Sequence, residues 1–151
     1  MPDQLQSLRV AALRLLTQRD HSRAELEKKL AAQAESAEAL DSVLERLQSE
    51  RLLSDHRFAS QRVASRGHRY GNARLKQELR QQGVSDEDIA AALPEAGDEA
   101  ARCLAVWRRK FSELPKTAEE RAKQMRFLQY RGFSGDAIQG VFRQSTHGAE
   151  E

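Results

Sequence analysis

Hydrophobic residues recur three and four positions apart along most of this 151-residue chain. This spacing places apolar side chains on one face of an α-helix and polar side chains on the other. The first predicted helix covers residues 4–18, and its inward positions are Leu5, Leu8, Ala12, Leu15 and Leu16. The same pattern predicts nine helices, which begin at or next to residues 4, 22, 36, 55, 72, 85, 98, 117 and 134.

Several chemical features recur with a period of 49 residues. Ser36, Ser85 and Ser134 share this spacing, and each is suited to cap a helix, because its hydroxyl can accept a hydrogen bond from a first-turn N–H group. The period also relates three leucines that precede the caps, Leu30, Leu79 and Leu128. A regular period predicts tandem structural repeats. We therefore expect an all-α protein with three tandem three-helix repeats in an elongated, curved helical array.

Local signals set the expected boundaries of the repeats. Capping boxes are predicted at Ser22 to Glu25 and at Thr117 to Glu120, and Gly83 is suited to the position after a helix. Asp55 is expected to cap the fourth helix, the seventh helix is expected over 98–113, and the ninth helix is expected to give way to polar residues near Ser145. The expected divisions are a first repeat at 1–54, a second and basic repeat at 55–95, a third repeat at 96–144 and a flexible polar tail at 145–151.

The composition agrees with a helical protein, since 39% of the residues are hydrophobic and only 5% are aromatic. Apolar runs fall short of the roughly 20 residues that span a bilayer, and no signal-peptide pattern is visible, so we expect a cytoplasmic protein without membrane contact. Cys103 is the single cysteine. It excludes an internal disulfide and is expected to be buried.

Positive charge is concentrated in the middle of the chain. The net charge is +2, yet residues 57–83 contain seven basic residues and one acidic residue. We predict that these seven form a basic face that binds a partner, namely Arg57, Arg62, Arg66, Arg69, Arg74, Lys76 and Arg80. Arg62, Arg66 and Arg69 are expected to share one side of the fourth helix. The alternatives are an ordinary solvated helix face or a surface for an anionic partner, either nucleic acid or an acidic protein groove.

Catalytic and metal-binding motifs are not apparent. The four histidines fall in different predicted helices or turns, and no paired cysteine or histidine motif is present. The segment Gly67 to Gly71 lacks the Lys-Ser/Thr ending of a phosphate-binding loop. We therefore expect no enzymatic activity, no metal and no cofactor.

Triplets of helices also allow a helix-turn-helix interpretation. The last helix of the middle triplet begins Ser85-Asp86-Glu87-Asp88, which places three carboxylates where DNA contacts would form. Electrostatic repulsion makes sequence-specific reading of the major groove a weak alternative.

The motif LLSDHRFA at 52–59, followed by Arg66, Gly71 and Arg74, resembles the bacterial RecX family of RecA regulators. The opening ALRLLTQRDHSRAELEKKL at 12–30 is similar to the start of that family, and the resemblance covers roughly residues 8 to 143.

This resemblance implies a small helical-repeat protein that binds the RecA nucleoprotein filament. In the family such binding suppresses filament growth, ATP hydrolysis, strand exchange and co-protease activity. No catalytic residue is implied, and the expected partner is RecA with single-stranded DNA, with weak direct DNA binding and a monomeric regulator. A helical-repeat protein that binds nucleic acid independently of RecA is the alternative.

Overall fold

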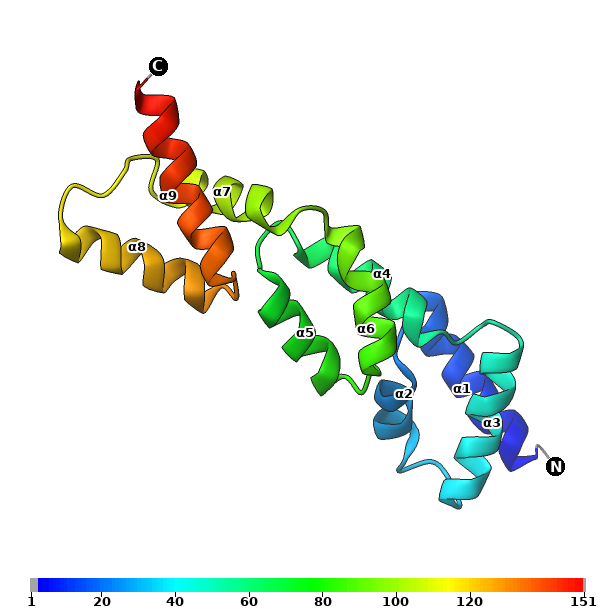
Figure 1. Ribbon diagram of the computed structural model, residues 1–151. Coiled ribbons are helices and arrows are strands. Elements are labelled where there is room, and N and C mark those ends of the chain that lie inside the picture. Colours follow the sequence, from blue (N-terminus) through cyan, green and yellow to red (C-terminus); the bar gives the residue numbers. More distant parts are fainter. Residues whose placement is uncertain (1–2, 151) are drawn as a thin grey trace. The chain divides into compact units, whose positions relative to one another are not determined.

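The computed structural model describes residues 3–150, with side chains for residues 3–143. These residues form nine α-helices, one short 3-10 helix and no β-strand, which confirms the predicted all-α class (Figure 1). The elements are α1 Gln4–Gln18, α2 Arg23–Leu30, α3 Ala37–Ser49, α4 Asp55–Arg66, α5 Asn72–Gln81, α6 Asp86–Ala92, the 3-10 helix Leu93–Ala96, α7 Glu99–Lys110, α8 Ala118–Tyr130 and α9 Gly135–Glu150.

The chain divides into two compact units. One combines the chain up to Gln61 with Leu79–Ala91, and the other combines Arg62–Glu78 with the chain from Ala92 onward. The unit boundary therefore passes through α4 and α5, inside the middle helix triplet.

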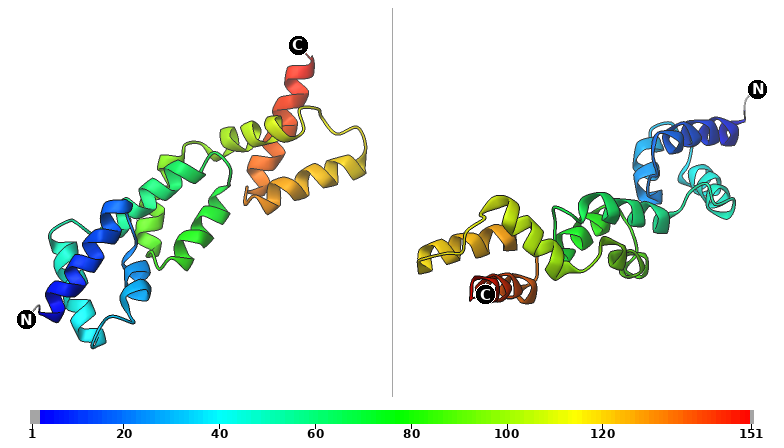
Figure 2. Two further views of the ribbon diagram at one scale, coloured as in Figure 1. Left: turned by 180° about the vertical axis from the view of Figure 1, so that it is seen from behind. Right: turned by 90° about the horizontal axis from the view of Figure 1, so that it is seen from above.

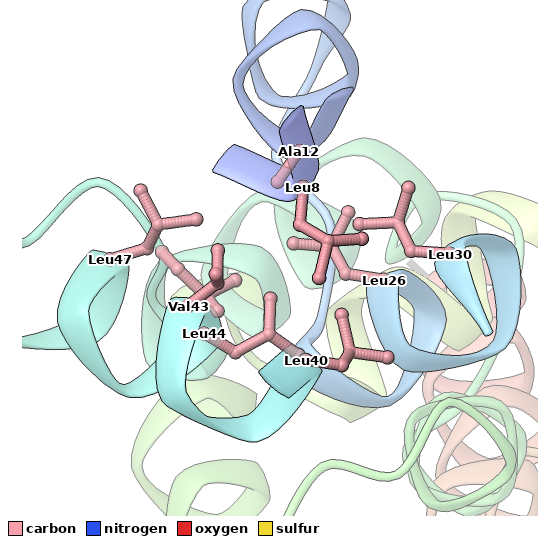
Figure 3. Packing of buried hydrophobic residues seen from close by; sticks show 9 residues of the cluster. Leu8, Ala12, Leu26, Leu30, Leu40, Val43, Leu44 and Leu47 are labelled. Atoms are coloured by element: carbon pink, nitrogen blue, oxygen red, sulfur yellow. The ribbon is translucent and has the colours of Figure 1, made fainter. Parts of the chain in front are cut away.

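The first unit contains a core built from α1, α2 and α3. Leu26 and Leu44 are fully buried in it, and Leu8 and Leu30 are nearly so. Figure 3 shows these side chains pointing toward one another from three helices, together with Ala12, Leu40, Val43 and Leu47. The predicted inward face of the first helix is confirmed at Leu8 and Ala12, whereas Leu5 is 39% exposed.

The second unit contains a core built from α7, α8 and α9, which pack against one another (Figures 1 and 2). Cys103, Trp107, Leu128 and Ile138 are buried in this core. The indole Nε1 of Trp107 donates a 2.8 Å hydrogen bond to Oε1 of Gln124, so the one polar atom of this ring is paired inside the core.

The 49-residue period corresponds to equivalent structural positions. The hydroxyls of Ser36, Ser85 and Ser134 each accept a hydrogen bond from the backbone N–H three residues ahead, at 3.0 to 3.2 Å. The leucines that precede them are buried in every repeat, namely Leu30, Leu79 and Leu128. The predicted caps and core leucines are confirmed.

The turn between α5 and α6 packs against the start of α2 in the first unit. Ser22 Oγ donates a 2.7 Å hydrogen bond to the carbonyl of Gln82. Gly83 has φ +79°, and a Cβ atom there would overlap Cβ of Ala24. Glycine is therefore required here both by the backbone conformation and by the close approach of α2.

The turn between α8 and α9 packs against the start of α5 in the second unit. The N–H of Gly71 donates a 2.9 Å hydrogen bond to the carbonyl of Arg131. Gly132 has φ +92°, and a Cβ atom there would overlap Arg74. This contact places residues 71 and 131 where the other junction places residues 22 and 82, so the contact between neighbouring repeats also follows the period of 49.

Some expected helix ends were wrong. The cap of α4 is Ser54, whose hydroxyl accepts from the N–H of Arg57 at 3.1 Å. Asp55 is instead the first residue of α4, and its carboxylate accepts a 2.7 Å hydrogen bond from the N–H of Arg23 in α2. Its side chain is therefore used by the neighbouring repeat rather than by its own helix.

The seventh and ninth helices also differ from expectation. α7 ends at Lys110 rather than near residue 113, because Ser112 adopts a left-handed conformation with φ 57°. The backbone of α9 continues to Glu150, although a polar tail was predicted from about Ser145. The sequence from Ser145 to Glu150 contains no proline that would end the helix. Residue 151 of the predicted tail lies outside the described residues.

Candidate partner-binding surfaces

The seven basic residues of the predicted face are distributed over both units. Arg57 and Arg80 belong to the first unit, and Arg62, Arg66, Arg69, Arg74 and Lys76 belong to the second. The two groups are therefore considered separately.

Arg57 holds the segment that precedes α4. Its guanidinium forms a 2.9 Å ion pair with Asp20 and donates to the carbonyls of Arg51 and Leu52, both at 3.2 Å. A side chain that makes these contacts stabilises a turn in addition to any role in binding. Its charge is also offset by Asp20, which reduces its attraction for an external anion.

Arg80 is compensated in a different way. It forms a 3.0 Å ion pair with Asp86, and both side chains are more than half exposed. Exposed pairs of this kind contribute little stability, typically up to about 1 kcal/mol. Arg80 can therefore exchange Asp86 for another anion at small cost.

In the second unit, Glu78 neutralises part of the basic cluster. Arg66 makes a two-pronged contact with its carboxylate, with nitrogen to oxygen distances of 2.8 and 2.9 Å. Arg74 lies 3.5 Å from the same carboxylate. The single acidic residue of the segment 57–83 is thus shared by two arginines of the predicted face.

Three guanidinium groups lie around the ring of Tyr70. Those of Arg66, Arg74 and Arg131 lie 4.7, 4.3 and 5.4 Å from the ring centroid. Such cation–π contacts hold arginine side chains in place without removing their charge. Neither Tyr70 nor Arg131 was identified from the sequence as part of a binding surface. The signal available for Tyr70 was an aromatic residue that lies between Arg66 and Arg74 in the sequence.

Arg69 does not share a helix face with Arg62 and Arg66, which corrects the prediction. α4 ends at Arg66, and Arg69 lies in the turn that follows. The chain leaves the helix at Gly67, where a Cβ atom would lie 2.9 Å from Cβ of Ala96. Arg69 is exposed in this turn, Lys76 is exposed on α5 and Arg62 is partly buried.

The turn after α4 also forms one wall of an open groove in the second unit. His68, Arg69 and Tyr70 line it from the turn, and the opposite walls come from α7 and α8. The groove encloses about 510 Å³, and its remaining lining residues are Val106, Arg109, Lys110, Phe127 and Arg131. Four of the eight residues are arginine or lysine and none is acidic. We call this feature the basic groove.

Groups for catalysis are unfavourable or lacking in the described part of the chain. Burial raises the pKa of the Cys103 thiol to about 12, so the thiol stays protonated and is a poor nucleophile at neutral pH. Among the described residues, no cluster of histidine, cysteine, aspartate and glutamate side chains is suited to hold a metal ion. No described helix is both long enough and apolar enough to cross a membrane.

These features define a class of protein: a tandem array of three-helix domains with arginine-rich surfaces. Three family models match the chain in order. They are the first three-helix domain of RecX at residues 9–47, the second at 54–93 and the third at 97–142. The chain therefore belongs to the RecX family of regulatory proteins.

Individual relatives agree with this assignment. The chain is 44% identical to regulatory protein RecX of Herbaspirillum seropedicae, over 95% of this chain and 94% of the relative. It is 42% identical to regulatory protein RecX of Ralstonia nicotianae, over 95% and 91%. The crystal structure of RecX from Lactobacillus salivarius superimposes with a TM-score of 0.83 over 95% of this chain and 97% of that chain. At 20% identity, this last similarity supports the fold.

Proposed function

We propose that this protein is a non-enzymatic regulator that binds the filament of RecA on single-stranded DNA. It inhibits filament extension, ATP hydrolysis, strand exchange and co-protease activity. The observation that supports this proposal is the ordered match of all three RecX domain models between residues 9 and 142. The proposal includes a monomer built from repeats at 1–54, 55–95 and 96–144.

The seven basic residues of the predicted face are proposed to contribute unequally to this binding. Arg57, Arg66, Arg74 and Arg80 have carboxylate partners within the protein. Arg69 and Lys76 are exposed, and neither forms an ion pair with a described residue. Their charge is available to an anionic partner at lower cost, so we propose that these two residues contribute most.

The test is the ATPase activity of RecA on single-stranded DNA, measured while this protein is added in amounts far below those needed to cover the DNA. We expect the ATPase rate to fall under these conditions, because a filament regulator acts on RecA rather than by sequestering DNA. The protein alone should hydrolyse no ATP. An unchanged RecA ATPase rate across the titration would exclude the proposed function.

A charge-reversal pair locates the contact. Arg69→Glu with Lys76→Glu should weaken inhibition and make it less dependent on salt, since fewer charges take part. The matched control reverses Arg14 and Lys28, which are also exposed and carry the same charge. If both pairs weaken inhibition equally, net charge rather than this surface determines binding.

Nucleic-acid binding without RecA is the second candidate function, and the basic groove favours it. One comparison distinguishes the two functions, namely the association of this protein with single-stranded DNA at physiological salt, with and without RecA. Under the first proposal tight association requires RecA, and under the second it does not. Association that is equally tight with and without RecA would favour the second.

A further inference from the structure

The basic groove keeps its positive charge because its cations are held by neutral groups. Arg109 Nη2 donates a 2.6 Å hydrogen bond to the carbonyl of His68, and Arg131 Nη1 donates a 3.3 Å hydrogen bond to the carbonyl of Arg69. A carbonyl orients a guanidinium but does not cancel its charge. This differs from Arg66 and Arg74, which share the carboxylate of Glu78.

The ring of Phe127 contacts two cations of the groove, Lys110 and Arg131. The Nζ atom of Lys110 lies 5.5 Å from the ring centroid of Phe127, and the guanidinium of Arg131 lies 5.0 Å from it. Phe127 in turn packs edge to face against Phe111, with centroids 5.4 Å apart. These two charged groups are thus placed in advance on a packed aromatic pair, which lowers the entropic cost of binding an anion.

Tyr130 adds an exposed aromatic surface beside the groove. It precedes Arg131 and is 77% exposed, which makes it the most exposed of the large hydrophobic side chains in the described residues. Arg74 contacts it, with the guanidinium 5.6 Å from the ring centroid. The face of this ring is therefore accessible to a planar group of a partner, next to the positive charges of the groove.

We propose that the basic groove and Tyr130 bind single-stranded DNA directly. Arg69, Arg109, Lys110 and Arg131 would contact consecutive phosphates, and Tyr130 would stack on an unpaired base. Stacking rings beside cations that follow the backbone are the usual means of binding single strands. Duplex DNA would satisfy the cations but not the ring, because its bases are already stacked. An acidic protein segment would likewise leave the ring without a matching surface.

This inference rests on the proposed function in one respect: it names the surface of this protein that contacts the DNA of the filament. Four of its five residues lie outside the face predicted from the sequence, namely Arg109, Lys110, Tyr130 and Arg131. Because it is tested without RecA, its failure leaves the RecA proposal intact, and failure of RecA inhibition leaves this site intact.

The experiment measures fluorescence anisotropy of a labelled oligothymidylate of roughly 16 nucleotides across a salt series. The full chain carries Arg109→Glu, Lys110→Glu and Arg131→Glu together. We expect binding to weaken at least about tenfold, and the slope of log affinity against log salt to fall by about 2, since each phosphate contact on a single strand contributes about 0.7. Circular dichroism establishes that the variant is folded.

The matched control carries Arg108→Glu, Lys123→Glu and Arg126→Glu. These residues are exposed on α7 and α8, outside the groove lining, and produce the same change in net charge. We expect them to leave most of the affinity and slope unchanged. Equal losses in the two triple variants would overturn the proposal.

Arg109 and Arg131 also donate hydrogen bonds to the carbonyls of His68 and Arg69, so the triple variant can fail to fold. Two milder variants keep the test valid in that case. Lys110→Glu alone should weaken binding, and Tyr130→Ala should weaken it roughly fivefold or more through lost stacking. Normal affinity in both would overturn the proposal. So would a polyglutamate peptide that competes as well as unlabelled oligothymidylate, since that would assign the groove to an acidic protein.

Discussion

The carboxylate of Asp55 accepts a 2.7 Å hydrogen bond from the backbone N–H of Arg23, and these two residues are the first residues of α4 and α2. The second unit repeats this arrangement. The carboxylate of Glu99, the first residue of α7, accepts a 2.8 Å hydrogen bond from the N–H of Asn72, the first residue of α5. In both junctions, an acidic residue that opens one repeat caps the second helix of the preceding repeat.

Asp55→Ala should therefore reduce the free energy of unfolding by about 1 kcal/mol, as the loss of a helix cap does. Asp55→Asn should lose less, because its amide oxygen can still accept the hydrogen bond. Urea denaturation measures both variants, with Glu35→Ala as a control at an exposed acidic side chain. Equal stability of the Asp55→Ala and Glu35→Ala variants would show that this contact contributes nothing.

Leu79→Ala should reduce the free energy of unfolding by about 2 to 5 kcal/mol, since this side chain is only 1% exposed and its removal leaves a cavity. Ser85→Ala should cost about 1 kcal/mol, because it removes only the hydrogen bond to the N–H of Asp88. Chemical denaturation compares the two. A smaller effect at Leu79 than at Ser85 would contradict the assignment of Leu79 to the core.

His21 should make the first unit sensitive to acid. Its side chain is 1% exposed, and burial lowers its pKa from the ordinary value of 6.5 despite its hydrogen bond to the Arg19 carbonyl. The unfolded chain therefore binds a proton more readily than the folded one. The stability from neutral His21 is complete above pH 6.5 and is lost as the pH falls toward the lowered value, by at most about 1.4 kcal/mol per pH unit.

Urea denaturation at about pH 7.5 and about pH 5.5 brackets this range. His21→Gln should reduce the difference in stability between the two pH values. The same substitution at the exposed His68 is the control and should leave the difference unchanged. An unaltered pH dependence in the His21→Gln variant would contradict the prediction.

Three glycine substitutions separate backbone strain from steric overlap. Gly97 and Gly132 both have positive φ, but only Gly132 has a neighbour that a Cβ atom would overlap. Gly132→Ala should therefore destabilise the protein by more than Gly97→Ala, whose cost is the backbone conformation alone (φ 87°, ψ −176°), about 1 to 3 kcal/mol. Gly140 lies inside α9 with open space around it, so Gly140→Ala should stabilise the helix by up to about 1 kcal/mol. Thermal unfolding ranks the three variants, and an equal loss at Gly97 and Gly132 would contradict the described overlap.

The caps and buried leucines could be predicted from the sequence because they depend on residues within a few positions of one another. Ser22, Ser36, Ser85 and Thr117 each bond a first-turn N–H of their own helix. Each such contact joins residues three positions apart, so its spacing is visible in the sequence.

The basic groove could not be predicted in this way. Arg131 meets the carbonyl of Arg69 across 62 positions, and Arg109 meets that of His68 across 41. No short spacing connects these residues. The position of Arg69 was also missed, because a helical spacing from Arg62 and Arg66 takes no account of the turn that begins at Gly67.

At the two junctions between repeats, a main-chain carbonyl at the equivalent position accepts a hydrogen bond from a different kind of donor. The hydroxyl of Ser22 reaches the carbonyl of Gln82, and 49 residues later the main-chain N–H of Gly71 reaches the carbonyl of Arg131. A main-chain carbonyl is present whatever the side chain, so mutation at the acceptor position cannot remove it. Copies of a duplicated segment can therefore diverge at this position while neighbouring repeats remain joined, and engineered arrays could recombine such copies if the turn glycine is kept.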